Sequence, residues 1–278
     1  MKYIWILIIL LFMGKASAYQ AYIDNENAVR SYINGNYFWI DDPIRDEKYL
    51  ISHGNGAYLP SKYTSLSRSG GSSVKIQIPS SRDNINNGGY PYNRSEIVVG
   101  NALPLEQEHW VRFSVYLQSQ FPDPDDWFCF FQVWQKDAGN PLVGLFLTRD
   151  GRLKANIKNN DYPSGAGLDL YTDQNQIDKG KWIDFVISFR GSLDTDGHLK
   201  IWRKLATSSC YESIVDVNNI NIGKTYLPST GELAQELEVY PKFGIYRGGS
   251  DLNHQMWFDE IKYNETGPLF YNMPPLCQ

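Results

Sequence analysis

The stretch Tyr240-Pro241-Lys242-Phe243-Gly244-Ile245-Tyr246-Arg247 has the pattern of a β-strand with polar chemistry on one side. Side chains alternate between the two faces of a strand, so Lys242, Gly244 and Tyr246 share one face and the apolar residues between them share the other. An amine and a phenol beside a glycine, which would let a ligand approach the backbone, suit an anionic substrate and a proton donor. An ordinary amphipathic strand with its polar side in water would show the same pattern.

Short apolar or alternating runs recur along the rest of the chain. They lie at residues 74–78, 111–117, 127–134, 142–148, 153–158, 182–189, 199–203, 242–247 and 256–263. Turn signals stand between them, such as Arg149-Asp150-Gly151-Arg152, Asp194-Thr195-Asp196-Gly197 and Asn86-Asn87-Gly88-Gly89. This rhythm predicts an all-β antiparallel sandwich.

Helical periodicity is weak, with short candidates near residues 25–33 and 230–237. Long loops are expected at 34–65, 79–93, 159–181 and 204–240. Loops of this length in a compact domain are usually functional, and at the mouth of a sandwich they would wall a groove.

The N-terminus has the pattern of a secretory signal peptide. Met1-Lys2 precedes an apolar run from Ile4 to Met13 and the small residues Ala16-Ser17-Ala18, and the run is short for a membrane span. We expect cleavage after Ala18, a single domain over residues 19–278, and a secreted or periplasmic protein. A retained N-terminal anchor is the alternative. No later stretch has the length and hydrophobicity of a membrane span, so we expect no membrane contact after cleavage.

The charge and the aromatic content narrow the class of ligand. The chain has a net charge of −5, and loss of Lys2 and Lys15 takes it to about −7. A nucleic-acid-binding protein would normally be basic. The 8 Trp, 19 Tyr and 13 Phe favour strands and suit contacts with sugar rings. An anionic substrate would then need a local cationic patch, and we expect the protein to act as a monomer.

The three cysteines cannot all pair within the chain. Cys129 lies in an apolar run and is expected to be a small buried hydrophobe, which leaves Cys210 and Cys277 as a disulfide in an oxidising compartment.

The sequence has no metal-binding signature, because the four histidines are widely scattered and the cysteines do not have metal-ligand spacing. We expect no organic cofactor and no catalytic metal. A structural calcium ion would be held near Asp123, Asp125 and Asp126, although that spacing is not diagnostic.

Three further segments have the same character as the tyrosine strand. Arg94 and Glu96 fall on one face if their segment is extended, where they could hold each other in place. Gln132 and Trp134 are expected to share a face with Phe128 and Phe130, an odd position for a lone amide, since buried amides need partners or a ligand.

The segment Leu153-Lys154-Ala155-Asn156-Ile157-Lys158 alternates polar and apolar side chains. Lys154, Asn156 and Lys158 would line one side of a strand. The recurrence of cations and amides in these segments, rather than Thr, Ser and Glu, indicates a binding surface for an anion, although a solvated sheet face is the plainer interpretation of each segment alone.

The order of these motifs resembles the jelly-roll polysaccharide lyases. The motifs, in chain order, are Arg94-Ser95-Glu96, Phe131-Gln132-Val133-Trp134, Gly180-Lys181-Trp182-Ile183-Asp184-Phe185-Val186, Asp196-Gly197-His198-Leu199-Lys200-Ile201-Trp202 and Lys242-Phe243-Gly244-Ile245-Tyr246-Arg247. The likeness spans roughly residues 45 to 263 and is greatest to the heparin lyase I-like and glucuronan lyase branch, with the alginate lyases also similar. It implies an antiparallel jelly-roll of the concanavalin A-like kind.

The resemblance also implies β-elimination at a uronic acid of an anionic polysaccharide. Neutralising the carboxylate stabilises the anion that forms when the C5 proton leaves. Gln132 and Arg94 are then placed at the carboxylate, Tyr246 is the acid and in one version also the base, and Lys242 supports the charge and lowers the pKa of the phenol. Glu96 would orient Arg94.

The chain departs from the alginate lyase pattern at one position. Those enzymes carry a histidine two residues after the glutamine, where this chain has Trp134, which has no titratable nitrogen but could stack on a sugar. The base is therefore Tyr246 itself or a histidine from elsewhere. His53, between small residues in a loop, is the first candidate and His254 the second.

Asn156, Lys158 and Arg247 complete the set of expected substrate contacts, together with Glu96 and Trp134. The acidic net charge favours unsulfated glucuronan or alginate over a sulfated polymer as the substrate.

Two other classes of function remain open from sequence. A glycoside hydrolase would need two facing carboxylates about 5–10 Å apart, and the adjacent Asp259 and Glu260 are expected to point to opposite faces. A non-catalytic, lectin-like module could keep the binding surface without requiring Tyr246.

Overall fold

The structure is a computed structural model that describes residues 20–23, 31–34, 37–42, 47–53, 60–80, 92–98, 103–135, 141–158, 167–223, 238–264 and 276–277. The regular elements in these ranges are all strands. They are β1 (Gln20–Ile23), β2 (Ser31–Asn34), β3 (Tyr37–Asp42), β4 (Glu47–His53), β5 (Ser61–Tyr63), β6 (Ser73–Ile78), β7 (Tyr92–Val98), β8 (Leu103–Pro104), β9 (Glu108–Leu117), β10 (Phe128–Gln135), β11 (Pro141–Leu147), β12 (Arg152–Ile157), β13 (Leu168–Gln176), β14 (Trp182–Arg190), β15 (Ser192–Leu205), β16 (Glu212–Ile222), β17 (Glu238–Gly248) and β18 (His254–Asn264). Within the described ranges there is no helix with the length and hydrophobicity to span a membrane.

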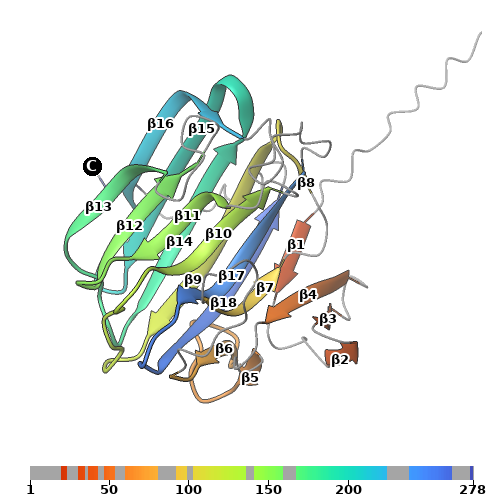
Figure 1. Cartoon of the computed structure of the whole chain (residues 1–278), viewed down its shortest axis with the longest axis vertical. Coiled ribbons are helices and arrows are strands. Elements are labelled where there is room, and N and C mark those ends of the chain that lie inside the picture. Colours follow the sequence, from red (N-terminus) through yellow and green to blue (C-terminus); the bar gives the residue numbers. More distant parts are fainter. Residues whose placement is uncertain are drawn as a thin grey trace, which may run out of the picture.

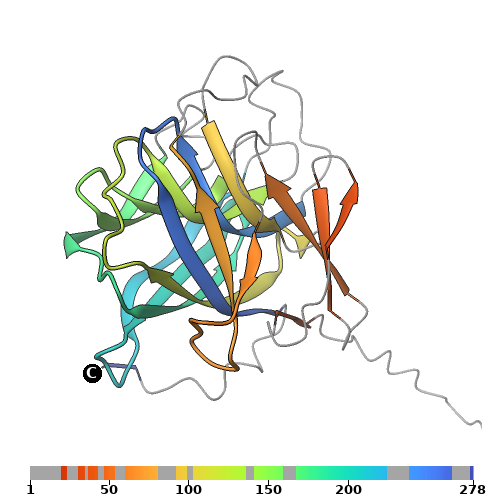
Figure 2. The same cartoon turned by 90° about the horizontal axis from the view of Figure 1, so that it is seen from below.

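The strands form two sheets that pack face to face (Figures 1 and 2). An eight-stranded sheet has the order β16-β15-β14-β9-β18-β6-β5 with β1 beside β18, and a ten-stranded sheet has the order β13-β12-β11-β10-β17-β7-β4-β3-β2 with β8 beside β17. Paired strands run antiparallel. The predicted all-β jelly-roll sandwich is confirmed.

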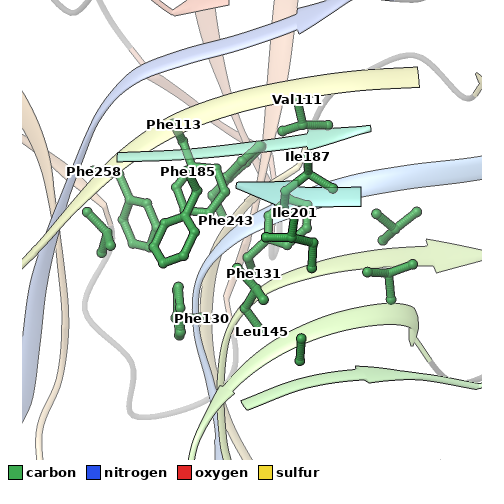
Figure 3. Packing of buried hydrophobic residues seen from close by; sticks show 14 of the residues in the cluster. Val111, Phe113, Phe130, Phe131, Leu145, Phe185, Ile187, Ile201, Phe243 and Phe258 are labelled. Carbon is green, nitrogen blue, oxygen red and sulfur yellow. The ribbon is translucent and has the colours of Figure 1, made fainter. Parts of the chain in front are cut away.

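The core lies between the sheets and is centred on Phe113 of β9 (Figure 3). Its ring lies 5.1 Å from that of Phe131 and 5.3 Å from those of Phe185 and Phe243, measured between ring centroids. Burying each of these side chains stabilises the fold by roughly 1.5–3 kcal/mol. Because Phe131 and Phe243 belong to the ten-stranded sheet, the core also fixes which residues of β10 and β17 face away from it.

Several segments expected to be loops contain strands. Two of these, β13 and β16, lie at sheet edges, where only one side pairs and where most of the side chains are at least partly exposed. The alternation of apolar and polar residues in these two strands is therefore too weak to predict them from the sequence. β3 and β4 likewise fall within the predicted loop 34–65.

The other local predictions have mixed outcomes. The turn Arg149–Arg152 is confirmed by Gly151 N donating to Thr148 O at 2.9 Å. The expected turn 194–197 instead lies within β15, where the register with β16 shifts between Ser192 and Gly197. Of the predicted helix 25–33, residues 31–33 belong to strand β2, and the rest lies outside the described residues, as do the predicted helix 230–237 and the turn Asn86–Gly89.

The predicted disulfide is confirmed, because Cys210 and Cys277 are bonded and Cys129 is a free, buried thiol. The bond ties the turn after β15 to the C-terminal segment, where Cys277 N also donates to Tyr211 O at 2.8 Å. The chain end is thereby fixed against the eight-stranded sheet.

The expectation that Asp259 and Glu260 point to opposite faces is wrong. Glu260 has a left-handed backbone (φ 52°) and the β18–β9 register shifts after Asp259. Both carboxylates therefore reach the same turn, where Asp259 Oδ2 accepts from Ser69 N at 3.3 Å and Ser69 Oγ donates to Glu260. Asp259 also accepts from the backbone N–H groups of Arg68 and Glu260, which is the role of a structural acceptor.

Candidate active site

We call the face of the ten-stranded sheet that points away from the core the site face. A bulge in β10 decides which residues reach it. The register of β10 shifts between Cys129 and Phe131 against both neighbours, so Phe130 and Phe131 both join the core cluster. Gln132 and Trp134 therefore lie on the site face with Cys129, and the expectation that they share a face with Phe128 and Phe130 is wrong.

Gly244 of β17 has a different role from the one its sequence suggested. Its backbone has φ +149°, and a Cβ there would lie 2.2 Å from Ser95 O and 2.7 Å from Glu96 Cα. The absent side chain thus makes room for the neighbouring strand β7 and not for a ligand. This close approach brings Glu96 beside β17 and β10.

Glu96 is the central carboxylate of the site face. It is 2 % exposed, its Oε1 accepts from Gln132 Nε2 at 2.5 Å, and its Oε2 lies 3.1 Å from Arg94 Nε. The predicted pairing of Arg94 with Glu96 is confirmed. One buried carboxylate therefore orients both the amide and the guanidinium that sequence analysis assigned to a substrate carboxylate.

Lys242 lies opposite Gln132 in the β17–β10 register. Its amine is 4.3 Å from the centre of the Trp134 ring, a cation–π contact. Burial lowers the pKa of Lys242 to about 8, although the nearby Glu96 charge opposes that shift. Among the described residues, Lys242 Nζ has no carboxylate at ion-pair distance, so its positive charge is poorly compensated.

β12 extends the site face past β11. Leu153, Ala155 and Ile157 are buried in the core, as their alternation predicted. Asn156 is buried and donates to Asp169 Oδ1 at 2.8 Å. Lys158 is also buried, and burial lowers the pKa of its amine, with the Cys129 thiol opposing that shift and Lys154 adding to it.

Tyr246 lies four residues along β17 from Lys242 on the same face, with Gly244 between them, and is opposite Arg94 of β7 and Cys129 of β10. The guanidinium carbon of Arg94 is 4.3 Å from the centre of the Tyr246 ring. Trp127 contacts the same ring edge-on at 4.6 Å between centroids. The cation against the phenol is thus Arg94 and not Lys242, which the sequence predicts there.

Arg247 does not join this group. It is 1 % exposed, and its guanidinium donates to Leu252 O at 2.9 Å and to Pro79 O at 2.8 Å and contacts His254. Burial lowers the pKa of Arg247 to about 10. The side chain points to the opposite side of β17 from Tyr246 and fixes segments around that strand.

His254 is likewise not in reach of the site face. It is fully buried between the rings of Phe121 and Phe128, and burial together with the Arg247 charge lowers its pKa to about 3. His53 ends strand β4, which pairs with β7, and is in register with Ser95; its side chain lies outside the described part of the structure.

The acidic residues considered for calcium are engaged otherwise. Lys179 Nζ lies 2.7 Å from Asp123 Oδ1, and Asp126 Oδ1 accepts from the backbone N–H of Trp127 at 2.8 Å. Within the described ranges, no three His, Cys, Asp or Glu side chains form a group that could hold a metal ion.

Three members of the site face were not assigned to the site from sequence. The bulge brings Cys129 to it, β13 supplies Asp169 from a segment predicted to be a loop, and the loop before β10 supplies Trp127. No sequence pattern predicts the bulge between Cys129 and Phe131. Trp127 could be predicted from sequence, because a tryptophan at the end of a strand is a candidate sugar contact.

Residues 47–262 match the polysaccharide lyase family. Among solved structures, the endo-β-1,4-glucuronan lyase from the fungus Trichoderma reesei is similar, with a TM-score of 0.60 and 16% identity over 82% of this chain and 94% of that one. The marine alginate lyase from Aplysia kurodai gives a TM-score of 0.52 with 10% identity over 74% of this chain and 87% of its own. No curated protein sequence matches the chain.

The family match covers most of the chain, so the protein belongs to the polysaccharide lyase family. It is an enzyme of the lyase class on a jelly-roll scaffold. The distant structural likenesses support the fold, and the residues of the site face have to carry any statement about substrate and mechanism.

Proposed function

We propose that the protein is an exported lyase that cleaves an unsulfated polymer of uronic acid by β-elimination. The observation that carries this proposal is the poorly compensated positive charge of the site face. Lys242 and Lys158 are both largely buried, and neither has a carboxylate of the described residues at ion-pair distance. A substrate carboxylate would supply the missing countercharge.

The proposed chemistry follows from what a uronate requires. A base removes the C5 proton, the electron pair forms the C4–C5 double bond, the C4–O4 bond breaks, and an acid protonates the departing O4. Gln132 and Arg94, held by Glu96, and the Lys242 amine would stabilise the charge that develops on the carboxylate. Such positioned donors typically contribute about 10²–10³-fold each.

Tyr246 is the proposed acid, because its phenol lies on the same face as Gln132 and Lys242 and against the Arg94 guanidinium. Tyr246 also acts as the base in the simplest version, in which one group transfers both protons on one face of the sugar. His53 is the alternative base. His254 is not proposed, since its ring is enclosed in the core.

Glucuronan and alginate are the proposed substrates. The similar solved structures include a glucuronan lyase and an alginate lyase, and the net charge of −5 disfavours a densely sulfated polymer. Export is proposed from the signal-peptide pattern of residues 1–18. N-terminal sequencing of the exported protein should begin at Tyr19, and a first residue of Met1 would refute cleavage.

The test is to incubate purified protein with glucuronan, alginate, hyaluronan and heparin and follow the ultraviolet absorbance of the unsaturated product. We expect a rise with glucuronan or alginate and a loss of about 10²–10⁴-fold in Tyr246→Phe. Tyr116→Phe, on the other sheet, is the matched control and should keep full activity. New reducing ends without absorbance would mean hydrolysis, and binding without either would mean a lectin-like module.

A further inference from the structure

A pocket of about 320 Å³ opens beside Tyr246 at one end of the site face. It is lined by the rings of Trp127 and Phe146, by the cations Arg149 and Lys154 and by Asp126, and the Lys154 amine lies 5.7 Å from the centre of the Phe146 ring. Trp127 connects the pocket to the candidate acid, because its ring contacts Tyr246 edge-on at 4.6 Å. The pocket and the catalytic group therefore share a wall.

The strand register gives the span between the two. Tyr246, Cys129, Phe146 and Lys154 lie opposite one another in succession on β17, β10, β11 and β12. Neighbouring strands are about 4.8 Å apart, so the backbone of Lys154 is roughly 14 Å from that of Tyr246. A carboxylate held at the Lys154 end of the pocket is therefore displaced along the sheet from a sugar that reacts at Tyr246, and this span fits a neighbouring unit of the same polymer.

The loop that carries Trp127 is held in place. Gly248 N donates to Trp127 O at 3.1 Å, and a Cβ on Gly248 would come within 2.1 Å of Asp126 Oδ2. The Asp126 side chain therefore packs directly against the backbone of Gly248. The indole is 39 % exposed, so it presents a ring to solvent from a fixed backbone.

The tight turn that carries Thr148 and Arg149 to the pocket is also fixed. Thr148 N donates to Arg152 O at 2.9 Å, and Gly151 N donates to Thr148 O at 2.9 Å. Gly151 has φ +73°, a conformation that strongly favours glycine. Both segments thus hold these positions before any ligand arrives, which lowers the ordering cost of binding.

The cations of the pocket have partners that a ligand can replace. Arg149 lies 3.7 Å from Asp126 with both side chains exposed, and Lys154 lies 3.3 Å from the exposed carboxylate of Asp169. Solvent-exposed ion pairs of this kind contribute about 0–1 kcal/mol. An incoming carboxylate that also stacks its ring on Trp127 would compete effectively for both cations.

We propose that this pocket binds a uronate unit next to the one that is cleaved, with its sugar ring on Trp127 and its carboxylate between Lys154 and Arg149. The identity of the polymer rests on the proposed function. The pocket would then select polymers that carry a carboxylate on the flanking unit as well as on the reacting one.

The test is calorimetric binding in the Tyr246→Phe background, which stops turnover, with hexasaccharides of β-1,4-linked glucuronate and of alginate. Adding Lys154→Met should weaken binding of the uronate oligomer about tenfold. Adding Trp127→Ala should weaken it by a similar factor, whereas Trp127→Phe should retain most of the affinity because it keeps an aromatic ring. Lys75→Met, on the other sheet, is the matched charge control and should change nothing.

The outcomes separate this proposal from the lyase mechanism. If the wild-type protein forms unsaturated product but Lys154→Met and Trp127→Ala bind like their parent, the pocket assignment is overturned and the proposed function stands. If no unsaturated product forms yet the variants still lose affinity, the proposed function fails and the pocket stands. If neither hexasaccharide binds the Tyr246→Phe protein, the pocket assignment is overturned as well.

Discussion

The two sheets bury charge on their non-core faces in opposite ways. On the eight-stranded sheet, Asp184 accepts from Arg68 at 3.0 Å and from Ser114 at 2.7 Å, and Lys204 lies 3.6 Å away. Burial alone would raise the pKa of Asp184, but the bonds from Arg68 and Ser114 outweigh it and hold that pKa below the ordinary value. Every charge in this cluster has a partner.

On the ten-stranded sheet, Lys242 contacts an indole ring, and burial lowers its pKa to about 8. Lys158 is buried in a similar way. Burial of charge alone therefore does not mark a functional site. A matched cluster stabilises the fold, whereas an unmatched cation is kept at a cost in stability and indicates a missing ligand.

The largest expected effect is that of Lys242→Met. It should lower kcat/KM about a thousandfold by removing a charge from the substrate carboxylate. It should also stabilise the fold by about 2 kcal/mol at neutral pH, since the buried cation is gone. Denaturant unfolding and product absorbance check both changes.

The matched control for that prediction is Lys204→Met on the other sheet. It removes a cation from a satisfied cluster, so it should leave kcat/KM unchanged and lower stability slightly. If the two substitutions changed stability equally, the two sheets would not differ in how they compensate buried charge.

Asp184→Asn should destabilise the fold by about 2–3 kcal/mol, because it leaves Arg68 and Lys204 without their shared countercharge. Activity per folded molecule should not change. Thermal unfolding followed by circular dichroism measures the first quantity, and product formation below the unfolding temperature measures the second. A loss of kcat at full folding would connect this cluster to the site.

Glu96→Gln should reduce kcat about a hundredfold with a smaller change in KM. The substituted side chain can still accept from Gln132 but no longer holds Arg94 by charge. Steady-state kinetics with Glu108→Gln as the control, an exposed carboxylate on the other sheet, tests this positioning role. If kcat were unchanged and only the melting temperature fell, Glu96 would have a structural role and no positioning role.

The smallest effect concerns alkaline pH. Lys242 has a folded-state pKa of about 8, below its ordinary value, so the free enzyme loses this cation as pH rises through 8. We expect kcat/KM to fall about fivefold between pH 8 and pH 9, as the protonated fraction of the amine falls. In Lys242→Arg the fall should move to higher pH, because arginine stays protonated.

Stability should change in the other direction over the same range. The unfolded chain keeps the lysine proton up to a higher pH than the folded one, so the unfolded state binds more protons and the contribution of Lys242 to stability rises from pH 8 upward. Wild-type stability should therefore approach that of Lys242→Met as the medium becomes alkaline. A constant gap between the two would contradict burial of the charged amine.

Local pattern was sufficient for the strands that contain the core. Alternation in residues 153–158 predicted both faces of β12, and the two-residue spacing of Arg94 and Glu96 predicted their pairing. Edge strands such as β13 escaped notice, because a strand that is mostly exposed has no apolar alternation to read. The three cysteines were enough to choose the disulfide, since burial of Cys129 left one pair.

The candidate site could be assembled from sequence only in part. Period-two alternation assumes an unbroken register, and the bulge between Cys129 and Phe131 reverses the face of everything before it. Arg247 is a different case, because it is next to Tyr246 in the chain and unbroken alternation already places it on the other side of the sheet. Spacing could place cations near one another but could not say which of them lacked a partner.

The sequence alone determined the all-β class, the disulfide and the polar rows on β7, β12 and β17, because these depend on residue type and on spacing within one strand. The tertiary structure decided the rest. Burial and partners are properties of groups from different strands. Only the packed sheets show that Asp184 is paired, that Lys242 has no carboxylate of the described residues at ion-pair distance, and that Gly244 lets the neighbouring strand β7 come close.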